Sequence, residues 1–221
     1  MTRFLSSRAA AAKRSARPRA LKIFPLMVML AGCASSGAPV ARIAEPGIAL
    51  AYLPLQARVH LGIDTADGAA VVIAPGIAVT NAHNANLVDA KSVIGSVREY
   101  DLMFFRTPRG TPPTIAPVQV GAGVTAYGQG SGGGLRIAHG VVRDITGCAG
   151  CTAPAYFTFS NGRRGEGDAG PGFSGGPVLD GAGRLIGITF GYKDIGRTRM
   201  IYAYDMSRVM AELSALAKSP K

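Results

Sequence analysis

The chain has no tryptophan, few aromatic residues and little charge. Of its 221 residues only 17% are charged and 7% are aromatic, whereas 30 are glycine and 14 are proline. Coiled coils and helix bundles need many charged helix formers, so this composition excludes them. The 48% share of hydrophobic residues excludes a chain that is disordered throughout. No hydrophobic run reaches the roughly 20 residues that a membrane-spanning helix requires, which excludes a multi-pass membrane protein.

The net charge of +11 comes mostly from one end of the chain. Residues 1–32 hold seven basic residues and no acidic one, so residues 33–221 carry 17 basic and 13 acidic side chains. Proteins that bind nucleic acids usually present a basic surface on the folded domain itself. Because the body of this chain lacks such an excess, we expect no nucleic-acid partner.

The N-terminus reads as an export signal. A basic stretch leads into a short hydrophobic run that ends in small residues at 30–33, Leu-Ala-Gly-Cys. These four residues resemble the bacterial lipobox, which implies a signal peptide over 1–32, lipidation of Cys33, and a membrane anchor built from acyl chains. Ala34 then implies the outer membrane of a Gram-negative bacterium, facing the periplasm or the surface. The alternative is an ordinary signal peptide that contains a cysteine.

Residues 33–47 are small and polar and contain proline, which is typical of a tether between an anchor and a folded body. Cysteine is scarce beyond Cys33, since only Cys148 and Cys151 remain. A single C-x-x-C cannot complete a four-ligand zinc site, so we expect neither a metal nor another cofactor. In an oxidising compartment a local disulfide between these two cysteines is favoured, and a free dithiol is the alternative.

The body has the pattern of a β-protein. Short hydrophobic or alternating runs, separated by glycine, proline, aspartate and asparagine, predict many antiparallel strands in a barrel or sandwich. The predicted strands are 59–63, 69–73, 77–80, 92–97, 102–106, 124–127, 137–145, 156–159, 177–179, 185–190 and 199–203. The turn at 180–183 predicts a hairpin. One helix is expected at the end, with Val209, Leu213 and Leu216 on one face and Asp205 or Ser207 as its N-cap.

A serine among glycines is the strongest chemical signal. Residues 170–178 read Gly-Pro-Gly-Phe-Ser-Gly-Gly-Pro-Val, with Ser174 in the middle. Glycine lets backbone N–H groups approach a reacting carbonyl without a Cβ in the way. A serine hydroxyl is a weak nucleophile until a base removes its proton, so a histidine and an acid are required.

The order of these residues along the chain separates the known kinds of serine hydrolase. All three histidines, at 60, 83 and 139, precede Ser174. An α/β-hydrolase needs a histidine after the serine, and none is present. A subtilisin-type order, with Asp64 or Asp67 before His83, is disfavoured because Pro177 and a predicted hairpin follow the serine in place of a helix. The order that remains is histidine, aspartate, serine.

Three segments in this order resemble the chymotrypsin (trypsin-like) serine protease family. They are Thr-Asn-Ala-His at 80–83, Tyr-Asp-Leu-Met-Phe-Phe-Arg at 100–106 and Phe-Ser-Gly-Gly-Pro-Val at 173–178. The resemblance implies an all-β fold of two antiparallel barrels over 48–221, with the catalytic cleft between them and a helix at the end. The short gap between the first two segments implies that the first barrel is trimmed.

The resemblance assigns roles to individual residues. Ser174 attacks the carbonyl of a protein or peptide substrate, His83 takes and returns the proton, and Asp101 orients the histidine. The backbone N–H groups of Gly172 and Ser174 form the oxyanion hole. Asp89 is a rival acid, but no hydrophobic strand follows it. Phe173 stands where zymogen-type relatives have an aspartate that pairs with a freed N-terminus, so that route of activation is not expected.

The same resemblance predicts the substrate contacts. Thr189, Phe190 and Gly191 resemble the strand that binds the substrate backbone. Asp168, six residues before Ser174, stands where the trypsin branch has the acid that selects arginine or lysine before the scissile bond. The expected function is that of a serine endopeptidase, and the alternative is a catalytically silent trypsin-like binding module on an envelope lipoprotein.

Overall fold

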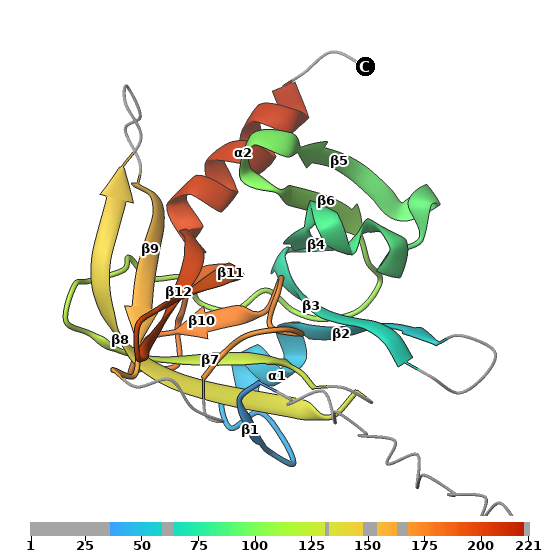
Figure 1. The fold of residues 1–221 in the computed structure, drawn as a ribbon. Helices are drawn as coiled ribbons and strands as arrows, with labels where there is room; N and C mark the ends of the chain where they lie inside the picture. The colour runs from blue at the N-terminus through green and yellow to red at the C-terminus, as the bar shows by residue number, and fades with distance from the viewer. Residues whose placement is uncertain (1–35, 59–63, 131–132, 148–153, 163–167, 219–221) are drawn as a thin grey trace, which may run out of the picture. The chain divides into compact units, whose positions relative to one another are not determined.

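The structure is a computed structural model that describes residues 36–58, 64–130, 133–147, 154–162 and 168–218 (Figure 1). Strands dominate this part of the chain, and the longest helix lies at its C-terminal end. The all-β prediction is therefore confirmed. Within the described ranges, no helix combines the length and hydrophobicity needed to cross a bilayer.

Six strands form a closed antiparallel barrel. They are β7 (Gly123–Gln129), β8 (Leu135–Gly147), β9 (Pro154–Ser160), β10 (Pro177–Leu179), β11 (Leu185–Ile195) and β12 (Thr198–Asp205). Their order is β8-β7-β10-β11-β12-β9, and β8 also pairs with β9, which closes the ring. The hairpin predicted at 180–183 joins β10 to β11. Closing the sheet removes exposed strand edges and encloses a core that includes Phe157 and Phe159.

A second antiparallel sheet has five strands. They are β2 (Tyr52–Arg58), β3 (Asp64–Ala74), β4 (Ile77–Asn81), β5 (Val93–Val97) and β6 (Leu102–Arg106). Their order is β2-β3-β4-β6-β5, and the described residues show no pairing between the two outermost strands. This sheet has fewer strands than the barrel, as the short gap between the histidine and aspartate segments predicts.

One hydrophobic core joins the two sheets. It includes Phe104 from β6, Tyr127 from β7 and Ile188 from β11, all almost completely buried. Because side chains of both sheets interdigitate there, the loops at the junction are held at a fixed separation. The candidate site lies at this junction.

Short helices connect some of the strands, and a longer helix follows the last one. They are α1 (Pro46–Ala51), the 3₁₀ helices η1 (Ala82–Leu87), η2 (Ala90–Ser92) and η3 (Arg98–Tyr100), and the terminal α2 (Met206–Lys218). The Asp205 carboxylate accepts a hydrogen bond of 2.7 Å from the Ser207 N–H, which confirms the predicted cap. Leu216 of α2 reaches Gly95 on β5, so this helix contacts the five-stranded sheet.

Several described elements at the N-terminal end and between the strands were not predicted from the sequence, among them β2 and α1. The strand β2 contains Pro54, which argues against a strand, but β2 is an edge strand where a missing N–H is tolerated. The helix α1 has only six residues and begins at Pro46, a residue suited to a first helical turn. The strand predicted at 59–63 lies outside the described residues.

The segment expected to be a tether carries structure from Ser36 onward. Ala38–Pro39 forms β1, which pairs with the first part of β8 (Figure 1). Ser36 and Ile43 are 7% and 9% exposed. Residues 36–47 therefore have the composition of a tether, but in the structure they pack along the barrel.

Candidate active site

His83 and Asp101 are brought together by the pairing of β4 with β6. Asn81, the last residue of β4, lies opposite Leu102, the first residue of β6. The residue that precedes β6 therefore lies beside the turn that follows β4. The Asp101 Oδ2 is 2.6 Å from the His83 Nδ1, and its Oδ1 accepts a 3.0 Å hydrogen bond from the His83 backbone N–H.

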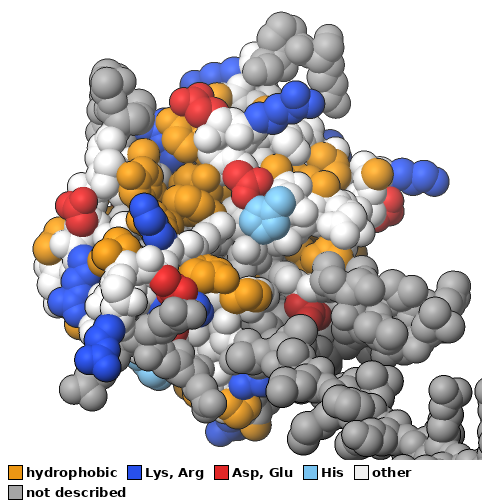
Figure 2. Space-filling view, viewed as in Figure 1, with side chains coloured by type: hydrophobic (Ala, Val, Ile, Leu, Met, Phe, Trp, Pro, Cys, Tyr) orange, Lys and Arg blue, Asp and Glu red, His pale blue; other side chains and the backbone are white. Residues whose placement is uncertain are grey.

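This geometry bears on the tautomer of the ring. A carboxylate only accepts hydrogen bonds, so the contact with Asp101 matches the tautomer of His83 that carries its proton on Nδ1. The other ring nitrogen, Nε2, is then the one able to accept a proton. The His83 side chain is 48% exposed. In the space-filling view, histidine side chains, in pale blue, reach the surface of the molecule (Figure 2).

The backbone of Asp101 is held in an unusual conformation. Its φ of 46° is the one positive value among the described residues other than glycine. Its carbonyl accepts hydrogen bonds from the Ala82 N–H at 2.8 Å and from the Asn81 side chain at 3.2 Å. Aspartate tolerates the left-handed region better than most residues, and these two bonds fix the carboxylate next to His83.

Ser174 lies on the loop between β9 and β10. Its carbonyl accepts hydrogen bonds from the Ala69 N–H at 2.9 Å and from the Asn84 side chain at 3.1 Å. Asn84 is 4% exposed and also donates to the Thr80 hydroxyl at 3.0 Å. The residue that follows His83 therefore holds the backbone of Ser174. Asn84 was not predicted, and its position next to the histidine was the one signal available.

A tight turn precedes the serine. The Phe173 N–H donates to the Gly170 carbonyl at 3.0 Å, and Gly172 has a φ of +87°. Proline at the second position and a glycine with positive φ at the third are typical of a type II turn. In the described structure neither the Gly172 N–H nor the Ser174 N–H donates a hydrogen bond. Both remain available to a carbonyl oxygen, as the oxyanion-hole prediction requires.

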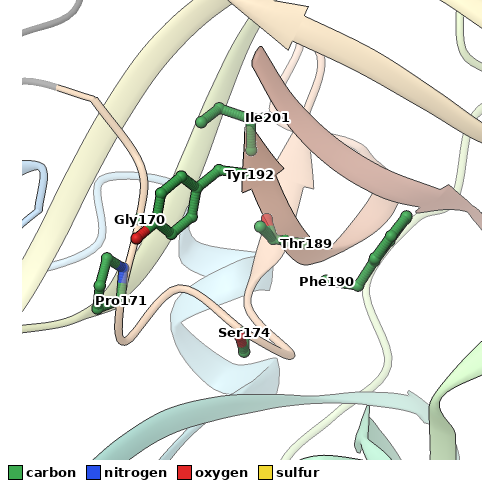
Figure 3. A pocket seen from close by; sticks show the side chains of 8 residues that line it. Gly170, Pro171, Ser174, Thr189, Phe190, Tyr192 and Ile201 are labelled. Carbon is green, nitrogen blue, oxygen red and sulfur yellow. The ribbon is translucent and has the colours of Figure 1, made fainter. Parts of the chain in front are cut away.

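A pocket of about 270 Å³ opens beside Ser174 (Figure 3). One side is formed by the serine loop and the other by β11 and β12. The lining residues are Gly170, Pro171, Ser174, Thr189, Phe190, Gly191, Tyr192 and Ile201. The structure thus brings the predicted Thr189-Phe190-Gly191 strand to the serine. The Thr189 hydroxyl is buried without a hydrogen-bond partner among the described residues.

Asp168 is not among the residues that line this pocket. It is 3% exposed, and its carbonyl accepts a 2.7 Å hydrogen bond from the Gly37 N–H. Arg199 lies within its electrostatic reach. The hydrogen bonds with Asp194, at 2.8 and 3.1 Å, raise the pKa of Arg199, and the charge of Asp168 adds to this rise.

The other sequence candidates lie elsewhere. His139 on β8 contacts the Thr125 hydroxyl at 3.1 Å, and Asp89 accepts a hydrogen bond from the Lys91 N–H at the start of η2. Cys33, Cys148 and Cys151 lie outside the described residues. In the part of the chain that the structure covers, no three His, Cys, Asp or Glu side chains form a potential metal site.

Known structures share this arrangement of strands. The Rv3671c protease of M. tuberculosis, in an inactive form, has a TM-score of 0.57 and 20% identity, over 84% of this chain and 98% of that one. The HtrA-type protease AlgW with a tripeptide has a TM-score of 0.60 and 19% identity, over 78% and 62%. A serine endoprotease of Yersinia pestis has a TM-score of 0.57 and 17% identity, over 77% and 64%. At these identities the likeness concerns the fold.

No curated protein matches the sequence. A family model does match, over residues 66–188, and its description is the trypsin-like peptidase domain. This range is more than half of the chain and includes His83, Asp101 and Ser174. The chain therefore belongs to the trypsin-like peptidase domain family.

Proposed function

We propose that the protein is a serine endopeptidase that cleaves peptide bonds through an acyl-enzyme. The Ser174 hydroxyl attacks the carbonyl carbon while the Nε2 of His83 takes its proton. Asp101 holds the tautomer of His83 and stabilises the imidazolium that forms. The N–H groups of Gly172 and Ser174 bind the oxyanion of the tetrahedral intermediate, and His83 then returns the proton to the leaving amine.

The observation that carries this proposal is the His83–Asp101 pair, 2.6 Å apart, together with the bond from the adjacent Asn84 to Ser174. A base needs an orienting partner and a nucleophile within reach of its second nitrogen. The pair supplies the orientation, and Asn84 limits the separation of the base from the nucleophile.

Labelling with a fluorophosphonate probe tests the proposal, because the probe phosphonylates an activated serine. Wild-type protein is expected to label, Ser174→Ala to show no labelling, and His83→Ala to label far more slowly. Ser214→Ala and His139→Ala are matched controls, since both side chains are exposed and distant in sequence from the proposed triad. Labelling that survives Ser174→Ala contradicts the assignment of the nucleophile.

The second candidate function is a silent module that binds peptides without cleaving them. No hydrogen bond joins the Ser174 hydroxyl to His83 in the described structure. Catalytic hydrogen bonds are often long before substrate binds, so this separation is compatible with either function. A folded wild-type protein that binds peptides but does not react with the probe would support the binding module.

The pocket supports a preference for a neutral, apolar side chain before the scissile bond. Its wall includes Phe190 and Ile201, and Phe190 stacks on Tyr204 with ring centroids 4.0 Å apart. An Asp168 that faced the pocket would favour arginine or lysine, but this residue is buried near Arg199. An arginine side chain in the pocket would then lose hydration without gaining a carboxylate partner.

We further propose that the protein is exported and anchored by lipids on Cys33 in the envelope of a Gram-negative bacterium. The support is the basic, hydrophobic and small-residue order that ends in Leu-Ala-Gly-Cys at 30–33. Metabolic labelling with a fatty acid that carries an alkyne tests this. Wild-type protein is expected to incorporate the label and partition with membranes, whereas Cys33→Ser does neither. Equal labelling of both contradicts lipidation at this residue.

A further inference from the structure

The N-terminal strap, defined here as residues Ser36–Pro39, lies directly on the serine loop, defined as residues Asp168–Gly176. The Gly37 N–H donates a 2.7 Å hydrogen bond to the Asp168 carbonyl. A Cβ added to Gly170 would lie 2.2 Å from the Ser36 hydroxyl, so these two residues are in close contact. The strap thus touches the loop four residues before the proposed nucleophile.

The strap also contacts the buried ring that precedes Ser174. Phe173 is completely buried, and a Cβ added to Gly37 would lie 2.6 Å from its ring. A glycine with a φ of +70° allows this approach. Phe173 lies between Gly172 and Ser174, whose N–H groups are the proposed oxyanion donors. The contact therefore acts on the residue that joins the two donors.

The strap itself is fixed to the barrel. Ala38 and Pro39 pair with Ile137 and Arg136 of β8, and the Arg136 guanidinium donates a 3.2 Å hydrogen bond to the Gly37 carbonyl. Its position is therefore set by the barrel and not by the loop that it touches.

The serine loop needs such external support. Four of its nine residues are glycine, and glycine loses more conformational entropy on ordering than any other residue. Contacts with Ala69, Asn84 and Thr189 hold the end of the loop at Ser174 and Gly175. The strap contacts the preceding part, at Asp168, Gly170 and Phe173, where the Gln129 N–H of β7 also donates a 2.9 Å hydrogen bond to the Gly172 carbonyl.

We propose that the N-terminal strap is a positioning element of the active site. By docking on Asp168, Gly170 and Phe173 it holds the type II turn at 170–173, which leaves the Gly172 and Ser174 N–H groups available to the oxyanion. This inference rests on the proposed peptidase function. It assigns to the strap a role in transition-state stabilisation beyond its role as an edge strand.

Two glycine substitutions in the full chain test the proposal. Gly37→Ala places a methyl group against Phe173, whereas Gly76→Ala, in the β3–β4 turn, introduces the same backbone strain without crowding. The two φ values are +70° and +72°, and the nearest atom to a Cβ on Gly76 is 3.8 Å away. Both variants are compared with wild type by fluorophosphonate labelling, resolved into probe affinity and the first-order rate of labelling.

Gly37→Ala is expected to lower the first-order labelling rate by roughly tenfold or more, because loss of one oxyanion donor costs about 10²- to 10³-fold in kcat. Hydrogen exchange of residues 168–176 is expected to accelerate in this variant, and Gly76→Ala is expected to match wild type in both measurements. Equal labelling rates in the two variants overturn the role of the strap. A wild type that does not label contradicts the proposed peptidase itself, and the strap's catalytic role with it.

A second pair of variants keeps the test decisive if Gly37→Ala does not fold. Gly170→Ala directs a methyl group at the Ser36 hydroxyl, and Ser36→Gly removes the nearest atom that it meets; the Arg199 guanidinium, 2.9 Å from the added Cβ, is the end of a flexible side chain that can shift. Gly170→Ala alone is expected to label slowly, and the double variant to recover most of the wild-type rate. If the double variant labels as slowly as Gly170→Ala, the contact between strap and loop has no part in catalysis and the proposal fails.

Discussion

The side chain of Asn84 donates a 3.1 Å hydrogen bond to the backbone carbonyl of Ser174, 90 residues further along the chain. Asn84 follows His83 on η1, and Ser174 lies on the loop of the barrel. This bond therefore ties the five-stranded sheet to the barrel at the point where base and nucleophile must meet. It also satisfies a buried amide, which is costly to leave without partners.

Asn84→Asp keeps the size of the side chain but removes both donated hydrogen bonds. A carboxylate in this buried position would face the Ser174 carbonyl and the Thr80 hydroxyl. We expect the free energy of unfolding to fall by about 1–3 kcal/mol and fluorophosphonate labelling to slow. Asn86→Asp, on the same 3₁₀ helix but exposed, is the control. Denaturant unfolding measures the first effect, and equal stability of the two variants contradicts it.

Asp101→Asn tests the orientation of the base. Asparagine tolerates a φ of 46°, so the backbone is preserved while the charge beside His83 is lost. We expect kcat to fall by roughly 10⁴-fold, since the amide allows the wrong tautomer of the imidazole. Asp89→Asn, which changes an acid at η2, is expected to retain activity. Peptide hydrolysis by both variants measures the difference, and comparable kcat values would remove Asp101 from the triad.

The turn before the serine is tested by Gly172→Ala. A Cβ on Gly172 would lie 2.0 Å from the Gln129 carbonyl, whereas nothing lies within 4 Å of a Cβ on Gly121. Both glycines have a φ above +80°, so Gly121→Ala reproduces the backbone strain alone. We expect Gly172→Ala to lose labelling by about 100-fold or more and Gly121→Ala to retain it. Retained labelling in Gly172→Ala would show that this turn does not form the oxyanion hole.

Substrate profiling with a peptide library tests the pocket. We expect apolar residues before the scissile bond, with Asp168→Asn leaving this preference unchanged. Gly191→Val adds volume to the pocket wall, where an added Cβ meets nothing within 4 Å. In this variant, kcat/KM for substrates with a large side chain before the scissile bond is expected to fall about tenfold more than kcat/KM for substrates with alanine there. A profile dominated by arginine or lysine that Asp168→Asn abolishes would return Asp168 to the role predicted from the sequence.

The β10–β11 hairpin supplies a prediction on pH. Burial alone raises the pKa of Asp180, but hydrogen bonds from Arg184 and from the Ala182 N–H outweigh it, so this pKa is lowered. Because the pKa of Asp180 is lower in the folded than in the unfolded state, its ionised carboxylate stabilises the fold at pH values above the unfolded pKa of about 3.9. This stabilisation is lost as the pH falls through the pKa of the folded state. Asp180→Asn is expected to lose about 1 kcal/mol of unfolding free energy at pH 7.

The same deficit is expected to shrink toward pH 2. Urea unfolding of wild type and Asp180→Asn at both pH values provides the measurement. A constant difference between the two proteins would contradict the link to the carboxylate charge.

Local patterns predicted most of the fold. Alternation and turn residues located every described barrel strand from β7 to β12, and the spacing of Val209, Leu213 and Leu216 located the helix α2. The strand β2 escaped because Pro54 argues against a strand unless its edge position is known. The strap was not predicted for another reason, since small polar residues look like a linker unless the surface on which they pack is known. Neither the edge position of β2 nor the packing surface of the strap can be inferred from the neighbouring sequence.

The candidate site was predictable where function dictates residue type. Peptide-bond hydrolysis of the proposed kind needs a serine among glycines, a histidine and an aspartate. These residue types and their order along the chain can be seen in the sequence. Asn84 and the strap act through contacts between segments far apart in the chain, which a motif cannot express. Asp168 does not line the pocket, and a fixed offset from Ser174 does not determine which way a loop residue faces, so its substrate role stays a prediction for the peptide library to test.

The sequence separation of these contacts has a consequence for folding. The bonds from Gly37 to Asp168 and from Asn84 to Ser174 each close a loop of 90 residues or more. Contacts of such high order form late, since the entropy of closing a long loop must be met before they stabilise the chain. An emerging chain that has not yet released β12 cannot complete the ring that positions Ser174. The peptidase activity proposed above is therefore expected only after β12 has been synthesised and has paired with β9.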